Sequence, residues 1–355
     1  MVRGLTVFTG PQAQPFLASA SFDRTIRLWD LQAPAADGDP DHPSADYVAL
    51  LPHPSGPPSL ISGGRAGEIT VRSVQTGRAT DMLTKPDDRP YKDVTALTVL
   101  ESTRDAAARI AIGYADGSVD LTTQEGPRRV LLPSYYSSSR VRALARFPHP
   151  ETGQLLLAAA ISDSRVEYLP VDDGTPYLPT LHADATVRAL AVLPGTTPRV
   201  LAIATTRAVR LLHPGHQPHT SLPQRIGAVR SLTCLTTADG SLLSTGGSDG
   251  VIRLWDPFAP RSETHVPLTG HQGPVTALAA LPHPDADRDL LVSACSDDTS
   301  IRLWDYHTGQ EVLRLVTGAP VTSLAVLPAG SANRSTAPAV IVGSPTGTAA
   351  VTVHL

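Results

Sequence analysis

The residues best suited to chemistry are histidines that stand near a carboxylate or near other histidines. His271 and Asp298 could supply two members of a catalytic triad, in which an aspartate orients a histidine that activates a serine. No serine elbow accompanies this pair, and buried polar groups need partners for structural reasons alone. We therefore interpret both residues as structural and expect no catalytic site.

Three histidines stand close together in a Pro-rich segment and could gather on one metal ion. They are His213, His216 and His219. An acidic or thiolate companion is missing, so a Pro-rich loop between outer strands is the favoured interpretation. Cys234 and Cys295 lie in separate apolar runs and form no CxxC pair, which indicates small buried hydrophobic residues. We expect neither a metal nor a cofactor.

The charge balance argues against two classes of partner. The chain of 355 residues has 29 basic and 33 acidic residues and a net charge of -4, which gives no attractive field for nucleic acid or for a membrane surface. No run approaches the ~20 apolar residues that span a bilayer, and residues 1–10 contain no signal-peptide stretch, so we expect a cytoplasmic protein. Lysine occurs only at Lys85 and Lys92 beside abundant Ala and Pro, a bias typical of GC-rich bacterial genomes.

An internal repeat organises the chain. Copies of the segment Val187–Leu193 begin at residues 2, 45, 94, 141, 187, 229, 275 and 321, the copy at 45 being weaker, and the intervals run from 42 to 49 residues. A period in this range is typical of propellers. Three histidines recur at one equivalent place in separated repeats: His53, His149 and His283. A propeller would hold them too far apart for ~2 Å bonds to one metal, so they are interpreted as turn residues.

Each repeat contains three or four short β-runs separated by turns, which predicts an all-β propeller that forms one domain over residues 1–355. Eight inner strands predict a single ring of eight repeat units whose last blade has three strands. The alternative is seven blades with one irregular unit. Residues 31–44, rich in Pro and Asp, predict an irregular loop in place of one outer strand.

Trp-Asp and Gly-His pairs stand at fixed places in these repeats. They are Trp29-Asp30, Trp255-Asp256, Trp304-Asp305 and Gly270-His271. In pattern and spacing they resemble the signature of WD40 repeats. The resemblance is strong in the first, sixth and seventh units, and the period carries it through the others. There the tryptophan place is held by Thr122, Leu169 and Leu212.

The resemblance implies a buried hydrogen-bonded tetrad of a loop histidine, a Ser or Thr on the second strand, a turn aspartate and the tryptophan. In the seventh unit it assigns His271, Asp298 and Trp304, with Ala294 at the hydroxyl place. In the sixth it assigns Thr245, Asp249 and Trp255, with Arg225 at the histidine place. In the first it assigns Ser19, Asp23 and Trp29, and Asp116 and Asp163 keep the turn place in the third and fourth.

The fold that the resemblance implies favours binding over catalysis. We expect a non-catalytic scaffold that binds a protein or peptide on one face of the ring. One alternative is a regulatory or sensor module of a larger signalling protein. The other is a propeller enzyme, which would need carboxylates or histidines converging at the central channel. The inner strands carry Thr, Ser, Ala and Arg instead, with Asp46 as the main acidic exception.

One candidate docking patch stands out. Two loops that open on the same side of a propeller, residues 87–92 and 135–140, are rich in Tyr and Arg, and Tyr114 is expected in a neighbouring turn. Tyrosine and arginine are favoured interface anchors. The predicted patch consists of Tyr135, Tyr136, Arg140, Arg89 and Tyr91.

Overall fold

The computed structural model describes most of the chain from residue 46 onward and three strands before it. The described residues are 2–9, 15–21, 26–30, 46–51, 58–64, 67–73, 79–84, 93–100, 108–124, 126–134, 139–162, 164–175, 177–194, 199–212, 220–222, 228–237, 240–258, 265–282, 289–327, 339–344 and 347–352. Before residue 46 the description covers the backbone only. The described residues contain no helix long and apolar enough to span a bilayer.

Within these residues the strands form eight antiparallel sheets. The first four sheets contain β1 (Val2–Thr9), β2 (Pro15–Ser21) and β3 (Ile26–Asp30); β4 (Tyr47–Leu51), β5 (Ser59–Gly63), β6 (Ile69–Ser73) and β7 (Ala79–Thr84); β8 (Val94–Leu100), β9 (Arg109–Tyr114), β10 (Val119–Thr123) and β11 (Arg129–Leu132); and β12 (Val141–Pro148), β13 (Leu155–Ile161), β14 (Arg165–Pro170) and β15 (Leu181–His182).

The other four sheets follow in chain order. They contain β16 (Val187–Val192), β17 (Leu201–Thr205), β18 (Val209–Leu212) and β19 (Thr220–Ser221); β20 (Val229–Thr237), β21 (Gly240–Gly247) and β22 (Ile252–Trp255); β23 (Val275–Pro282), β24 (Asp289–Cys295), β25 (Ser300–Asp305) and β26 (Gln310–Val316); and β27 (Ser323–Leu327), β28 (Ala339–Ser344) and β29 (Gly347–Thr352). Each sheet is a meander, because neighbouring strands in the chain are neighbours in the sheet.

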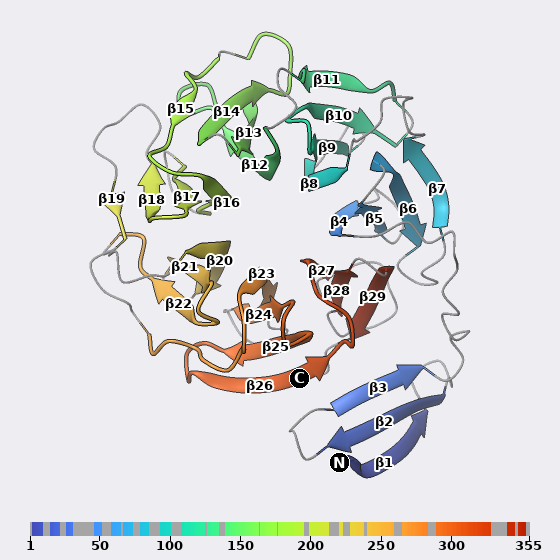
Figure 1. Cartoon of the computed structure of the whole chain (residues 1–355). Coiled ribbons are helices and arrows are strands. Elements are labelled where there is room, and N and C mark those ends of the chain that lie inside the picture. The colour runs from blue at the N-terminus through green and yellow to red at the C-terminus, as the bar shows by residue number, and fades with distance from the viewer. Residues whose placement is uncertain are drawn as a thin grey trace.

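The sheets from β4 onward surround a central opening as the blades of a propeller (Figure 1). Their inner strands contact one another in the order β4, β8, β12, β16, β20, β23 and β27, and β27 contacts β4. The Thr322 hydroxyl donates a hydrogen bond of 2.8 Å to the backbone oxygen of Asp46 across this last contact. The all-β propeller expected from the repeat is therefore present.

The expectation of a single ring of eight units is wrong. The sheet β1–β3 lies outside the circle in Figure 1, and β3 contacts the outer strand β26. The physical reason is that β27 packs directly on β4, which leaves no place in the ring for a further inner strand. The repeat pattern identifies a unit that forms strands, but it does not determine where the unit docks. Residues 31–44, expected to be an irregular loop, lie outside the described residues.

An irregularity of pairing recurs at the start of the inner strands. The register shifts between Val94 and Ala96, and at the same place in four later blades: Val141/Ala143, Val187/Ala189, Val229/Ser231 and Val275/Ala277. A β-bulge leaves one residue out of the ladder and re-aims its side chain. In these five blades the bulged residue is the one after the anchor valine, so the side chain of that residue is re-aimed at the start of the inner strand.

The hydrophobic core lies between neighbouring blades. One cluster, for example, joins Val119 and Leu121 of β10 to Leu157 and Ile161 of β13. At Val141, close packing of the anchor valine requires glycine on the preceding blade. A Cβ atom added to Gly113 would lie 2.5 Å from a methyl carbon of Val141, a separation that real Cβ atoms do not adopt.

Candidate functional site

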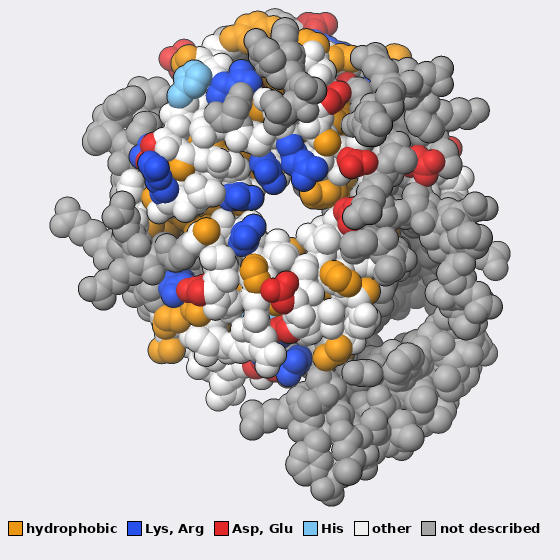
Figure 2. Space-filling model, viewed as in Figure 1, with side chains coloured by type: hydrophobic (Ala, Val, Ile, Leu, Met, Phe, Trp, Pro, Cys, Tyr) orange, Lys and Arg blue, Asp and Glu red, His pale blue; other side chains and the backbone are white. Residues whose placement is uncertain are grey.

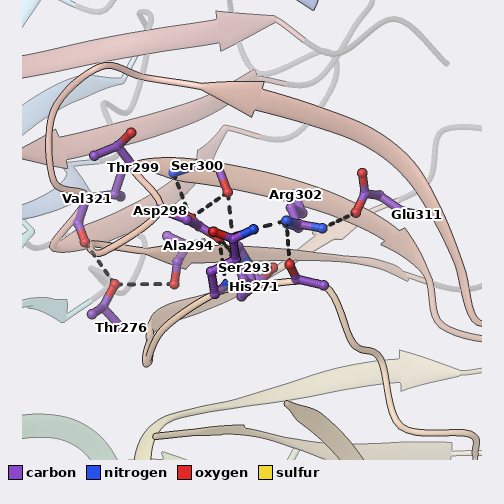
Figure 3. A network of polar contacts seen from close by, with 12 residues as sticks. His271, Thr276, Ser293, Ala294, Asp298, Thr299, Ser300, Arg302, Glu311 and Val321 are labelled. Atoms are coloured by element: carbon purple, nitrogen blue, oxygen red, sulfur yellow. Dashed lines mark hydrogen bonds and ion pairs between the residues drawn. The ribbon is translucent and has the colours of Figure 1, made fainter. Parts of the chain in front are cut away.

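A buried polar network links the loop before β23 to β24 and β25 (Figure 3). The two ring nitrogens of His271 lie 2.9 Å from Asp298 Oδ2 and 2.8 Å from Ser293 Oγ. Trp304 donates its indole N–H to the same Ser293 hydroxyl at 2.8 Å. The structure thus brings together His271, Asp298 and Trp304, the three residues assigned in this unit.

The assignment of Ala294 to the hydroxyl place is wrong by one residue. Ser293 is fully buried and holds that place, whereas Ala294 belongs to the apolar core on the other face of β24. The reason is the two-residue period of a strand, in which a shift of one position moves a side chain to the opposite face. Ser293 pairs with Arg302 as Thr245 pairs with Arg253, so the register makes these two hydroxyls equivalent.

Asp298 closes the network from the turn after β24. Its Oδ1 accepts hydrogen bonds from the backbone N–H and the hydroxyl of Ser300, and its Oδ2 accepts one from the backbone N–H of Gln272. Burial alone raises the pKa of this carboxyl, but the hydrogen bonds from His271, Ser300 and Gln272 outweigh burial and hold the pKa well below its ordinary value of 3.8. Asp298 therefore stays a carboxylate at neutral pH.

Arg302 extends the network toward the outer strand. Its guanidinium pairs with Glu311 and donates to the backbone oxygen of Gly270 at 2.7 Å. It also lies 5.9 Å from the centre of the Trp304 ring, within the range of a cation–π contact. These contacts tie the fourth strand and the incoming loop to the buried tetrad.

The sixth unit keeps only part of this arrangement. Trp255 is buried and donates its indole N–H to Thr245 Oγ1 at 3.0 Å, as expected. Asp249 does not join this pair, because its side chain is 37% exposed and forms an ion pair of 2.9 Å with Arg253. The position given to the histidine, Arg225, lies outside the described residues.

In the first unit the structure describes only the backbone. Ser19 pairs with Arg27 in β2 and β3, the register that Ser293 has with Arg302. Nothing further bears on the assigned roles of Ser19 and Trp29, and Asp23 lies outside the described residues. That assignment stays a prediction.

A different network occupies the third unit, and the sequence analysis missed it. Asp120 has a fully buried side chain and forms an ion pair with Arg128, whose guanidinium lies 5.6 Å from the Tyr114 ring. Burial, followed by the nearby charge of Asp120, raises the pKa of Tyr114. The available signal was an aspartate between two apolar strand residues, Val119 and Leu121. Asp116 does keep its turn role, because it accepts hydrogen bonds from the N–H and hydroxyl of Ser118.

His271, Cys295 and Asp298 form the one group of three potential metal ligands in the described part of the chain. Their ligand atoms lie within 4.8 Å of one another. Both ring nitrogens of His271 are engaged by hydrogen bonds, and burial raises the pKa of the Cys295 thiol. The geometry therefore supports a structural hydrogen-bond network at this place.

The other histidines and cysteines can be judged in part. His149 is buried, and its Nδ1 accepts hydrogen bonds from the backbone N–H groups of Glu151 and Thr152, which fits a turn residue. Cys234 is partly buried in the core, and burial raises its pKa to about 12. The remaining histidines singled out lie outside the described residues: His53, His213, His216, His219 and His283.

The predicted docking patch is described at one residue only. Arg140 is exposed, and its backbone N–H donates to Ser162 Oγ at 2.8 Å. The other four members lie outside the described residues: Arg89, Tyr91, Tyr135 and Tyr136. Tyr114, expected in an exposed turn beside this patch, is instead buried at the end of β9, where its ring packs in the core.

One mouth of the central opening carries the bulged residues of the inner strands. Three successive blades, β12, β16 and β20, place arginines there, and we call Arg142, Arg188 and Arg230 the arginine arc. Figure 2 shows basic side chains gathered on this side of the opening. Beyond β20 the equivalent residues are threonines. The Thr276 hydroxyl donates to the backbone oxygen of Val321 on the next blade at 2.8 Å, as Thr322 does to Asp46.

Comparison with known proteins gives a consistent result. Residues 8–30, 217–256 and 262–305 match the family described as WD domain, G-beta repeat. A ribosome biogenesis protein of Podospora anserina is 26% identical over 319 residues, which cover 84% of this chain and 58% of that protein. A target of rapamycin complex subunit of Schizosaccharomyces pombe is 26% identical over 52% of this chain and 56% of its own length.

A shorter match is to the serine-threonine kinase receptor-associated protein of Gallus gallus, 35% identical over 26% of this chain and 25% of that protein. The chain thus spans between a quarter and somewhat over half of the length of these relatives, all of them eukaryotic, so the bacterial source suggested by composition stays a prediction. The repeated meander, the Trp304 network and the three matched regions lead to one conclusion: the chain contains WD40 repeats in these three regions and has an all-β propeller fold.

Proposed function

We propose that the chain is a non-catalytic scaffold that binds protein or peptide partners on one face of its ring. The observation that carries the proposal is a contrast between polar groups that bind one another inside the protein and polar groups that form no ion pair within the described residues. The network around His271 uses its polar groups on one another in the interior. In the arginine arc, in contrast, Arg230 is exposed and Arg142 and Arg188 are partly exposed, so a partner can reach them. A fold alone does not assign function, so the argument rests on this surface.

The names of the relatives support the same class of function. One is a subunit of the target of rapamycin complex, and another is a 40 kDa protein of the U5 small nuclear ribonucleoprotein of Dictyostelium discoideum. Both names describe a component of a large assembly. We extend it to this chain as a proposal.

Two further expectations belong to the proposal. We propose a ring of seven blades that begins at β4, with the unit β1–β3 attached outside it. The order of inner-strand contacts and the packing of β27 on β4 support this count. We also propose a cytoplasmic location.

The predicted patch gives the first test. The full chain serves as bait in an affinity capture, and captured proteins are identified and then purified for direct binding measurements. The double variant Tyr135→Ala/Tyr136→Ala is expected to lose affinity by roughly tenfold or more, because interface tyrosines are frequent hot spots. Tyr177→Ala is the matched control, since Tyr177 is 82% exposed and lies outside the patch. Unchanged affinity of the double variant would remove the patch, and failure to bind any partner would remove the scaffold function.

A further inference from the structure

The arginine arc has a geometric origin in the repeat. Arg142, Arg188 and Arg230 each follow an anchor valine and occupy the bulge of their inner strand. Because β12 contacts β16 and β16 contacts β20, the three bulges are neighbours at one mouth of the opening. Three guanidinium groups are therefore presented on one arc by three successive blades.

The three arginines of the arc form no ion pair within the described residues. The ion pairs found there involve other arginines, such as Arg210 with Asp184 at 2.7 Å, and none involves the arginine arc or Arg140 beside it. Arg142 also has a buried Nε atom without a hydrogen-bond partner. A buried donor without a partner is costly, and an anionic group at this place would satisfy it.

The arginines act on one another as a cluster. Burial lowers the pKa of Arg142, and the charges of Arg188, Arg140 and Arg230 lower it further. Like charges that share one space repel, and an anion that binds among them relieves this repulsion. Tyr47 of β4 lies near enough for the charges of Arg140 and Arg142 to act on its hydroxyl group.

The sign of the surface changes around the opening. The equivalent residue of the second unit is Asp46, and the other equivalent positions hold Thr95, Thr276 and Thr322. A nucleic-acid strand requires a continuous basic track for its phosphates, whereas a short acidic peptide requires only a compact basic arc. The net charge of -4 also gives no general attraction for a polyanion. The observations favour a short acidic segment as the occupant.

We propose that the arginine arc binds a short segment of a partner protein that is rich in aspartate and glutamate. This inference rests on the proposed scaffold function and specifies the partner chemistry for one mouth of the ring. Each arginine offers a planar pair of donors that matches a carboxylate, and successive blades present these pairs along the segment.

The test uses the full chain and a short fluorescent peptide of alternating Glu and Gly, with binding followed by fluorescence anisotropy. The triple variant Arg142→Gln/Arg188→Gln/Arg230→Gln is compared with a control that also loses three surface charges, Arg129→Gln/Arg146→Gln/Arg199→Gln. All three control residues are exposed, and Arg146 lies toward the opposite end of β12 from the arc. Thermal melts of both variants establish that they fold.

The expected result is binding to the natural chain that weakens with added salt, falls by roughly tenfold or more in the arc variant and is retained in the control. A peptide of alternating Gln and Gly should not bind. Absence of Glu-Gly binding to the natural chain, or equal loss in both variants, overturns the proposal. Tighter binding of an oligothymidylate that also depends on the arc overturns it as well, in favour of nucleic acid. If the arc variant still binds a captured protein partner with full affinity, the scaffold function stands and only the acidic-segment proposal fails.

Discussion

The threonine and arginine sides of the ring mouth use one position of the repeat in opposite ways. Thr276 and Thr322 are short, and their hydroxyls cross to the backbone of the next blade. Arg188 and Arg230 stand at the equivalent bulges and make no such bond within the described residues. A repeat position that stabilises the blade junction in one half is therefore free for binding in the other. The arginine side of the mouth is therefore the side on which we place the proposed binding.

The same contrast extends to the interior of the two halves. The blade β23–β26 has the complete network of His271, Ser293, Asp298 and Trp304, whereas in the blade β16–β19 the tryptophan place is held by Leu212 and the hydroxyl place by Ile203. The complete network therefore lies on the threonine side. Substitutions on that side should cost stability, and substitutions in the arginine arc should cost binding.

The largest expected effect is at Trp304. Trp304→Ala should lower the free energy of unfolding by about 3–5 kcal/mol, because it leaves a cavity against the core and removes the partner of Ser293 and Arg302. Denaturant unfolding measures the difference. Trp304→Phe, which keeps most of the volume, should cost less, and equal stability of Trp304→Ala and the natural chain would contradict the assignment of this blade as the stabilising one.

Asp298 should give the next largest effect. Asp298→Ala removes the acceptor for His271 and Ser300 and is expected to cost about 1–3 kcal/mol. The equivalent aspartate of the sixth unit, Asp249, is the matched control. Its exposed ion pair with Arg253 predicts a cost of at most about 1 kcal/mol for Asp249→Ala. Equal thermal shifts for the two variants would break the distinction between a complete and a partial network.

The pH dependence of stability sharpens the role of Asp298. Its pKa is lowered in the folded chain, so its contribution is fully present above its ordinary value of 3.8 and is lost as the pH falls through the folded pKa. Asp298→Asn lacks this titration. The stability difference between the natural chain and this variant should therefore shrink as the pH is lowered below about 4. A difference that is constant across this range would show that the carboxylate is not held by the network.

A smaller effect is expected at the threonine side of the mouth. Thr322→Val preserves the shape of the side chain but removes the hydrogen bond to Asp46 across the last blade contact. The expected cost is about 1 kcal/mol, and amide hydrogen exchange should increase in β27 and β4. Thr322→Ser retains the hydroxyl and should restore most of the protection, which separates the bond from simple packing.

The smallest stability effect is expected in the arginine arc. Arg188→Gln removes a charge with no partner in the described residues and should change stability by no more than about 0.5 kcal/mol. Relief of repulsion among the arginines could even raise it slightly. A loss as large as that of Thr322→Val would show that the arc is structural and would end the contrast between the two sides.

Much of the fold could be predicted from the sequence because the repeat has a strict period. The register places Thr122, Leu169 and Leu212 opposite the residues that correspond to Leu291, the partner of Trp304, so the alignment of the degenerate units is confirmed. The resemblance to WD40 repeats also identified the buried Trp255 and Trp304. These features are local, and local features leave a pattern in the sequence.

The errors came from properties without a local signal. To choose Ser293 over Ala294, the sequence would have to show which face of the sheet each residue of β24 occupies. The adjacent small residues Ser293 and Ala294 do not show this. The place of β1–β3 depends on which inner strand closes the ring, a contact between distant segments. The arginine arc went unrecognised because Arg142, Arg188 and Arg230 are separated by whole repeats, and only the curvature of the ring brings them together.

The contact between β27 and β4 has a consequence for how the protein is made. Thr322 and Asp46 are separated by 276 positions, so a nascent chain cannot close the ring until the segment that contains Thr322 has left the ribosome. Until then β4 has an unprotected flank, and the loop-closure entropy of joining such distant segments must be met late in folding. Closure of the ring should therefore be the slow step of folding. An open intermediate with an exposed β4 is the species that chaperones would bind first or that would aggregate first.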